Sequence, residues 1–224
     1  MKKLTVMLVS FVALSTQAFA QREPGSVSAQ TKLGRYTAEK TIENMVGSPY
    51  LFEDWKAATV RFANGKVYKD MQVKYNQVDD KLLLKGETGE PMTFVDPVVE
   101  FRIPAASGET QYRNGFKPSA NNTEKTFYEV MFDGNIKLLK KVSKTIIESQ
   151  NYNSPSVVKN IDQQVHFFVV KQDQSTEFRP NKKAILEVLK DKADLVNTFI
   201  AGTKVDFKSD ESLKSIFVYY NSLL

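Results

Sequence analysis

The stretch AATVRFANGKVYKDMQVKYNQVDDKLLL, residues 57–84, decides the fold class because apolar and polar residues alternate along much of it. Val60 and Phe62 alternate with polar neighbours, and the pair Asn64-Gly65 follows them. Such a pair between alternating segments is the strongest short-range signal of a β-hairpin, since both residues tolerate a positive φ. The second half alternates again and reaches Asp79-Asp80, another turn signal. The stretch therefore predicts antiparallel strands joined by tight turns.

The same pattern continues towards the C-terminus. Further strands are predicted over residues 81–85, 92–95, 99–103, 126–132 and 164–171. Residues 136–147 fit a helix or a strand, and the strand is favoured because the turn signal Asp133-Gly134 comes directly before them. Residues 104–117 and 148–160 are polar and are expected to be loops.

Beyond residue 180 the apolar spacing changes to that of a helix. Asn181 and Ser209 are suited to accept hydrogen bonds from the first free backbone N–H groups of a helix. Gly202 is suited to end a helix in the left-handed conformation. The last helix is expected to bury the stripe Leu213, Ile216, Phe217 and Tyr220.

Together these patterns predict an α+β fold, mainly an antiparallel β meander (an open roll or half-barrel) followed by a short C-terminal helical segment. One globular domain is expected over residues 37–224, with the antiparallel β region in 57–180 and the helical tail in 181–224. Residues 21–36 are expected to be a disordered leader. A short helix is predicted over residues 37–46.

The first 20 residues have the pattern of a secretory signal peptide. Lys2 and Lys3 precede an apolar stretch over residues 4–14, and Ala18-Phe19-Ala20 resembles a cleavage site. Because the chain has no cysteine, the route to a lipid anchor at Gln21 is closed. The sequence thus predicts a protein exported to the periplasm or beyond, not a lipoprotein and not membrane-spanning after signal cleavage. An uncleaved membrane anchor is the alternative that this segment leaves open.

The charge pattern is a poor match to nucleic-acid binding. The formal net charge is +5, of which Lys2 and Lys3 contribute two charges, and the other basic residues are dispersed among acids. The densest basic group is expected to be the solvated face of one element, and it consists of Lys137, Lys140, Lys141 and Lys144. No nucleic-acid partner is therefore predicted.

Few residues of this sequence could support catalysis or hold a metal. Without cysteine the chain lacks thiol nucleophiles and thiolate metal sites. His166 is the one histidine, and it lies in an apolar segment without a G-x-S-x-G motif nearby. We expect it to be a sheet residue that forms a local hydrogen bond, and we predict no metal site and no cofactor.

Paired carboxylates could still hydrolyse glycosides. The candidates are Asp79, Asp80, Asp96 and Glu100. The first three fall at predicted turns, where aspartate is favoured because it bonds its own backbone. Glu100 is expected to point towards solvent. Asparagine variants of Asp79 and Asp80 would separate the two roles, since an enzyme would lose turnover whereas a turn pair would change only stability.

Three aromatic residues, Tyr50, Phe52 and Trp55, come close together before the first clear strand. Buried, they would plug one end of the sheet, which is the favoured interpretation for a lone tryptophan. Exposed, they would form a binding surface for a sugar or an apolar partner. They are the candidate ligand-binding residues of this sequence.

Several short segments resemble a group of uncharacterised exported proteins of Bacteroidota-type bacteria. The similar segments are Gly47-Ser48-Pro49-Tyr50, Lys74-Tyr75-Asn76, Phe127-Tyr128-Glu129-Val130-Met131, Leu138-Leu139-Lys140-Lys141 and Tyr219-Tyr220-Asn221. The resemblance implies a cell-envelope or secreted setting and brings no known activity, ligand or catalytic residue.

The favoured function is that of an exported, soluble, non-enzymatic binding protein or cell-envelope accessory protein, whose partner is an envelope protein or a glycan. One alternative is a carboxylate-dependent glycoside hydrolase. Another is a structural partner of an outer-membrane assembly that docks through a sheet edge or the last helix.

Overall fold

The computed structural model describes residues 33–36, 45–106, 108–150 and 157–224. The signal peptide predicted over residues 1–20 lies outside the described residues, as does most of the predicted leader. The end of that leader is not a free tail, because Gly34–Tyr36 pairs with another strand as β1. Of the helix predicted over residues 37–46, the described part is Met45–Val46, which forms the short strand β2 instead.

Antiparallel sheet dominates the structure, as the sequence predicted, and the sheet is open. The strands after β2 are β3 (Lys56–Phe62), β4 (Val67–Asn76), β5 (Lys81–Lys85), β6 (Pro91–Phe94), β7 (Val98–Ala105), β8 (Gly108–Arg113), β9 (Tyr128–Asp133), β10 (Ile136–Gln150), β11 (Val157–Lys171) and β12 (Gln174–Phe178). Their order across the sheet is β1-β6-β5-β4-β3-β7-β8-β9-β10-β11-β12, and β2 pairs in parallel with β11.

Turn chemistry accounts for much of this meander. Gly65 has a φ of +82°, and Phe62 and Lys66 close the hairpin through a backbone hydrogen bond of 2.9 Å. Asp80 has a φ of +54° in the turn between β4 and β5. Both turns were predicted from sequence. The strand interpretation of residues 136–147 is also confirmed, since they lie within β10.

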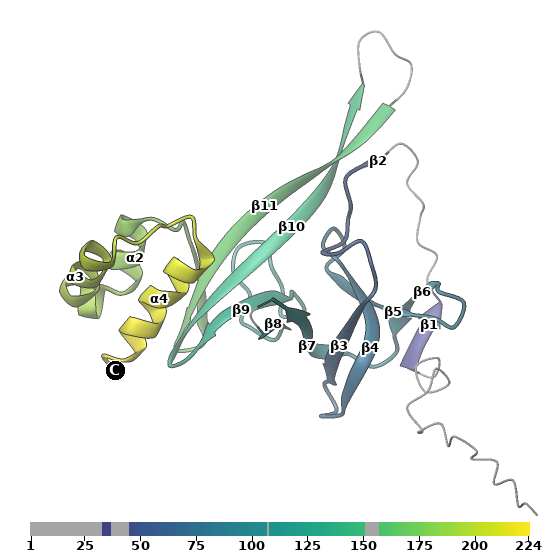
Figure 1. Cartoon of the computed structure of the whole chain (residues 1–224), viewed down its shortest axis with the longest axis horizontal. Helices are drawn as coiled ribbons and strands as arrows, with labels where there is room; N and C mark the ends of the chain where they lie inside the picture. The colour runs from purple at the N-terminus through teal and green to yellow at the C-terminus, as the bar shows by residue number, and fades with distance from the viewer. Residues whose placement is uncertain (1–32, 37–44, 107, 151–156) are drawn as a thin grey trace, which may run out of the picture.

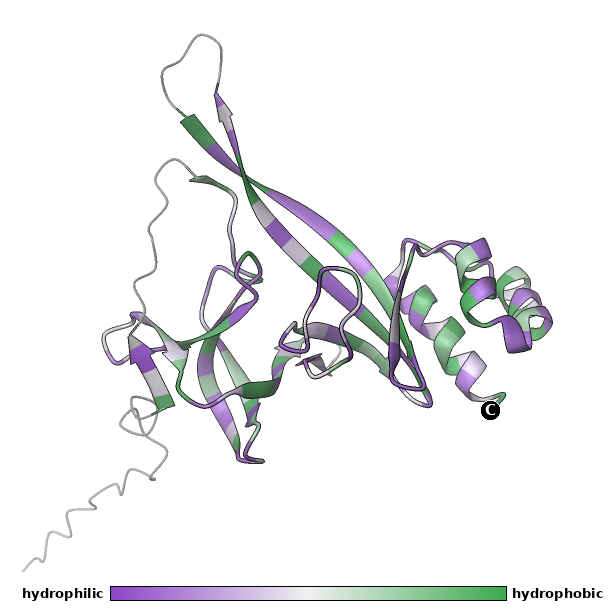
Figure 2. Ribbon diagram, turned by 180° about the vertical axis from the view of Figure 1, so that it is seen from behind, coloured by the Kyte–Doolittle hydropathy of each residue, from purple (hydrophilic) through white to green (hydrophobic). Residues whose placement is uncertain are grey.

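Two predicted loops are wrong in part. Residues 104–117 contain the strand β8. Its polar composition gave no strand signal in the sequence, because the face of β8 that points away from the core is exposed to solvent. Residues 148–160 include the ends of β10 and β11. These 15-residue strands form a long twisted ribbon that projects from the rest of the molecule (Figure 1). Hydrophobic and hydrophilic segments alternate along it (Figure 2), as expected for strands with one half-buried face.

Two large apolar cores lie along this one sheet. The first core packs strands β3 to β8 on each other, with Val60, Phe62, Leu84 and Phe101 at most 1% exposed. The second core packs β9 to β12 under the C-terminal helices, with Leu138 and Phe217 fully buried. A smaller cluster around Tyr128, Leu139 and Phe168 includes residues of β9, β10 and β11.

The sheet curls enough to bring β10 next to the turn between β4 and β5. In strand order β3, β7, β8 and β9 separate β4 from β10. The backbone N–H of Lys144 on β10 nevertheless donates to the carbonyl oxygen of Gln77 at 3.2 Å. The side chain of Lys141 reaches Asp80 in the same turn. This curvature agrees with the predicted open roll.

The helical tail covers one end of the sheet (Figure 1). It consists of α2 (Lys182–Val188), the 3₁₀ helix η1 (Lys190–Lys192), α3 (Ala193–Thr203) and α4 (Asp210–Asn221). Asn181 and Ser209 cap α2 and α4 as predicted, accepting from the N–H groups of Ala184 and Ser212. The buried stripe of α4 is also as predicted. Gly202 does not end α3, because Lys204 takes the left-handed conformation with a φ of 50°.

Burial of a tyrosine in the smaller cluster predicts a pH dependence. Burial, aided by the charge of Asp80, raises the pKa of Tyr128 from 10.0 to about 12. Between these values the unfolded chain loses its proton first, so stability falls as pH rises. We expect the free energy of unfolding to drop by about 2 kcal/mol more from pH 10 to 12 in the wild type than in Tyr128→Phe. Urea unfolding at both pH values measures this difference, and equal drops would contradict the assignment.

Candidate functional site

Each of the three aromatic residues singled out from the sequence lies beside a lysine, and we call these five residues the aromatic–lysine surface. Tyr50, Phe52 and Trp55 belong to the segment between β2 and β3. Lys56 is the first residue of β3, and Lys74 lies on β4. The surface thus combines a loop with two neighbouring strands, which pair through Lys56 and Val73. Because successive residues of a strand point to opposite faces, Lys74 lies on the other face of this strand pair from Lys56.

Local backbone contacts hold this loop against the end of β4. Tyr50 forms a bridge with Asn76, and the N–H of Leu51 donates to the carbonyl of Tyr75 at 2.9 Å. The N–H of Gln77 donates to the carbonyl of Pro49 at 2.8 Å. The residues before and after Tyr50 are therefore hydrogen-bonded to the end of β4, and this fixes the backbone that carries the aromatic rings.

Lys144 on β10 fastens the same loop from the other side. Its Nζ donates to the carbonyl oxygens of Ser48 at 3.0 Å and Tyr50 at 2.5 Å. Burial lowers the pKa of Lys144, and the charge of Glu53 opposes this lowering. Lys144 therefore binds the loop through backbone carbonyls, and it is not part of a solvated basic face.

The rings do not plug the sheet. Phe52 is 41% exposed, while Tyr50 and Trp55 are half-buried. The residue of this loop that packs against the first core is Leu51. The plug interpretation is therefore wrong, because a single aliphatic side chain fills the space at the core and leaves the aromatic side chains partly in solvent.

The lysines lie over the aromatic rings at distances typical of cation–π contacts. The Nζ of Lys74 is 4.9 Å from the ring centroid of Tyr50 and 5.1 Å from that of Trp55. The Nζ of Lys56 is 5.4 Å from the ring centroid of Phe52. Each exposed contact of this kind contributes about 0.5 to 1 kcal/mol and orients an ammonium group beside an aromatic face.

The candidate carboxylates of a hydrolase are held in separate places. Asp79 accepts from Asn76 Nδ2 at 3.3 Å, and Asp96 accepts from Asn64 Nδ2 at 3.2 Å. Both contacts lie at the turns predicted from sequence.

Glu100 does not point into open solvent as predicted. Its side chain is 5% exposed, and Oε1 lies 3.0 Å from Arg61 and 2.9 Å from Arg102. The face of β7 that carries Glu100 is covered by these two arginine side chains. In the described ranges, no group of three or more histidine, cysteine, aspartate or glutamate side chains could hold a metal ion.

Asp80 belongs to a buried polar cluster that sequence reasoning missed. Its Oδ1 lies 2.7 Å from Lys141 Nζ and accepts a short hydrogen bond from the Tyr75 hydroxyl. Lys141 Nζ also donates to Tyr75 Oη at 3.0 Å, and the N–H of Phe127 donates to Asp80 Oδ2 at 3.3 Å. These contacts join β4, β10 and the segment before β9. We call Tyr75, Asp80 and Lys141 the closing cluster.

Burial controls the ionisation of the closing cluster. Desolvation lowers the pKa of Lys141, and the negative charge of Asp80 opposes that effect. Desolvation also raises the pKa of Tyr75 well above its ordinary value, with Asp80 adding to the rise. Among the described residues, Asp80 therefore supplies the one carboxylate that forms an ion pair with the buried ammonium of Lys141.

The basic group of β10 is not a solvated face. Lys141 is 6% exposed, although it lies among lysines in the sequence. Lys137 pairs with Asp133 at 2.6 Å, and Lys140 pairs with Asp210 of α4. The period-two pattern contained a signal for Lys141, since it falls on the same face as the buried Leu139 two residues earlier.

His166 has the local role that was predicted. Its Nδ1 lies 2.7 Å from Oε1 of Glu177 on the neighbouring strand β12. The contact joins adjacent strands at the half-exposed surface of the sheet.

The structure defines a class by its architecture: an open antiparallel sheet with a helical C-terminal segment. Comparison of the chain with protein-family models, curated proteins and solved structures found no match. The resemblance to exported Bacteroidota-type proteins therefore stays a prediction. No helix among the described residues is long and apolar enough to cross a membrane.

Proposed function

We propose that this protein is an exported, non-enzymatic binding protein of the cell envelope, and that the aromatic–lysine surface binds an acidic glycan. The proposal places the protein in the periplasm or outside the cell, in keeping with the signal peptide predicted at residues 1–20. Its main support is the group of Tyr50, Trp55 and Lys74, in which one ammonium lies over two partly exposed aromatic rings of an anchored loop, with Phe52 and Lys56 as a second such group.

Sugar rings present apolar C–H faces, which pack well on aromatic side chains. Trp55 and Tyr50 offer large ring surfaces, and a few such aromatic side chains commonly carry most of the binding energy of an interface. The loop that carries them is tied to β4 and to Lys144. A site held in place before binding loses less conformational entropy when the ligand arrives.

Charge favours an acidic sugar over a neutral one. Lys74 places its ammonium between Tyr50 and Trp55, and Lys56 adds a second ammonium beside Phe52. A carboxylate or sulfate on a stacked sugar can form a charge-assisted hydrogen bond with such a group. Glu53 and Asp54 are exposed in the loop, so we place the acid group of the ligand on the strand side, at Lys74.

Replacing Lys74 with glutamine should weaken binding of acidic oligosaccharides about five- to tenfold, the size of a typical net hydrogen bond of about 1 kcal/mol. Isothermal titration calorimetry with oligogalacturonate and with chondroitin sulfate fragments measures the change. The fully methyl-esterified oligogalacturonate, which keeps the sugar and removes its charge, should bind the wild type as weakly as the acidic form binds Lys74→Gln.

Lys69→Gln is the matched control, because Lys69 is an exposed lysine on the same strand and the substitution removes the same charge. We expect it to change the affinity less than about twofold, as for a distant screened charge. Equal losses for Lys69→Gln and Lys74→Gln would show attraction to net charge only and would contradict the proposed site. Equal binding of the ester and the acid would contradict the acidic ligand.

A further inference from the structure

The last strand of the sheet, β12, has a free edge. It pairs with β11 on one side and has no strand neighbour on the other in the described part of the chain. Gln172 and Asp173 form the two-residue turn between them, with φ values of 51° and 62°. Lys171 and Gln174 close this turn as a register pair.

Register determines which backbone groups of β12 face outwards. In a two-residue hairpin the pair next to the turn is hydrogen-bonded, and bonded and non-bonded pairs then alternate. The N–H and C=O groups of Ser175 and Glu177 therefore point away from β11. No proline or lysine occurs among the residues of β12, although natural edge strands often carry them to prevent pairing with other chains.

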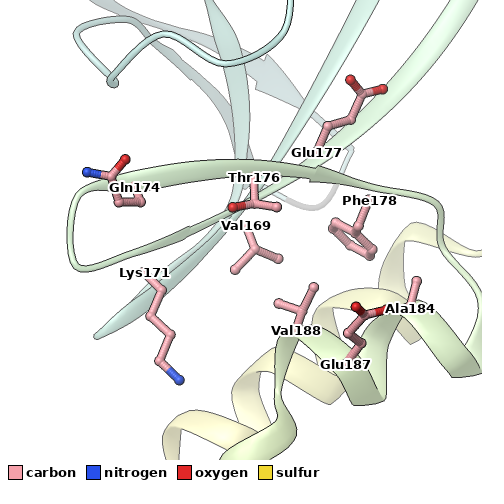
Figure 3. A pocket seen from close by; sticks show the side chains of 9 residues that line it. All are labelled: Val169, Lys171, Gln174, Thr176, Glu177, Phe178, Ala184, Glu187 and Val188. Carbon is pink, nitrogen blue, oxygen red and sulfur yellow. The ribbon is translucent and has the colours of Figure 1, made fainter.

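A cavity of about 400 Å³ lies beside this strand, between the sheet and α2. Figure 3 shows Val169, Thr176 and Phe178 of the sheet directed towards Ala184 and Val188 of α2. Val169 and Phe178 are buried, whereas Thr176 at the entrance is exposed. The cavity thus has an apolar floor beside a row of free backbone groups.

Of the three charged side chains that line this cavity, the carboxylate of Glu187 is available to pair with a binding partner. The ammonium of Lys171 is held by Asp191 at 2.8 Å and by the Tyr220 hydroxyl at 3.2 Å. Glu177 is held by His166. Glu187 on α2 is exposed and lines the cavity, and no contact of its carboxylate is found with the described residues.

We propose that an extended segment of a partner protein adds to β12 as a further strand and places an apolar and a basic side chain against α2. The free groups of Ser175 and Glu177 would bind the partner's backbone. Side chains two residues apart share a face, so the partner's recognition pattern is apolar-x-Lys or apolar-x-Arg, in either chain direction. The apolar residue enters the cavity and the basic residue pairs with Glu187.

An array of seven-residue peptides tests this proposal with the full chain. Threonine occupies the odd positions, and valine, leucine, lysine, arginine or glutamate varies at the three even positions. We expect the strongest binders to carry an apolar and a basic residue two positions apart. Ala184→Trp, which fills the cavity, should weaken them about tenfold or more, as loss of a central anchor does. Ala201→Trp, an exposed alanine of α3, is the matched control and should bind like the wild type.

A charge exchange keeps the test decisive if Ala184→Trp fails to fold. Glu187→Lys should weaken lysine peptides about fivefold, the upper range for an exposed ion pair, and should favour peptides with glutamate at the same position. Bound peptide should slow amide hydrogen exchange at Ser175 and Glu177, and leave β1 at the opposite edge unchanged. The proposal is overturned if charge preference does not follow residue 187, or if protection appears at β1 and not at β12.

Discussion

Replacing Asp80 with alanine lowers the free energy of unfolding by about 3 to 5 kcal/mol, the cost of leaving a buried charge without its partner. Lys141 is 6% exposed and pairs with Asp80 Oδ1 at 2.7 Å. The substitution also removes the acceptor for the Tyr75 hydroxyl and the Phe127 N–H. Urea unfolding followed by circular dichroism measures the loss.

Asp79→Ala provides the matched control, because Asp79 is the adjacent aspartate of the same turn and its contact with Asn76 Nδ2 is exposed. We expect it to lower the free energy of unfolding by less than about 1 kcal/mol. Similar losses for both variants would mean that the contacts of Asp80 with Lys141 and Tyr75 add no stability. The closing cluster would then not stabilise the curled sheet.

The second large effect concerns the helical tail. Phe217→Ala should lower the free energy of unfolding by about 3 to 5 kcal/mol, as usual when a buried phenylalanine is truncated. Phe217 is fully buried among helices and strands of the second core, and its ring lies 6.2 Å from that of Phe178. Val218→Ala is the control, since Val218 is its neighbour in α4 and is 47% exposed. Its effect should stay within about 0.5 kcal/mol.

The shape of the Phe217→Ala transition tests the expected single domain. The two large cores are joined through one continuous sheet and through the contacts of Lys141 and Lys144 with the β4–β5 region. A cooperative unit unfolds in one transition seen equally by different probes. If fluorescence of Trp55 beside the first core and circular dichroism of the helices change at different urea concentrations, the expectation of one domain is wrong.

Local chemistry made much of the fold predictable. Asn64-Gly65 and Asp79-Asp80 carry their turn information in adjacent residues, and the caps Asn181 and Ser209 do the same for helices. β8 was missed because its outward residues are polar and only Tyr112 is buried within it. Strand periodicity gives no signal when most of a strand lies at the surface.

Long-range contacts account for the other errors. Lys141 and Asp80 are distant in the sequence, and their pairing depends on how far the sheet curls. Glu100 is covered by Arg61, which comes from the paired strand β3. A sequence pattern gives the face on which such a residue lies. It does not give the side chain from another strand that covers it.

The candidate site was predictable to a similar degree. Tyr50, Phe52 and Trp55 are close in the sequence, so their grouping was expected. Lys74 joins Tyr50 and Trp55 because the loop docks on the end of β4, as the bridge between Tyr50 and Asn76 shows. That docking depends on backbone contacts between the loop and β4, which form only in the folded chain. The residue types of the loop do not predict these contacts.

Fluorescence of Trp55 tests the central claim most directly, because it is the single tryptophan of the chain and lies in the aromatic–lysine surface. The account predicts that acidic oligosaccharides change its emission in a saturable way. It also predicts that Lys74→Gln shifts the midpoint to higher concentration while Lys69→Gln does not. Emission that stays constant while calorimetry records binding of the same oligosaccharide would place the ligand elsewhere and contradict the account.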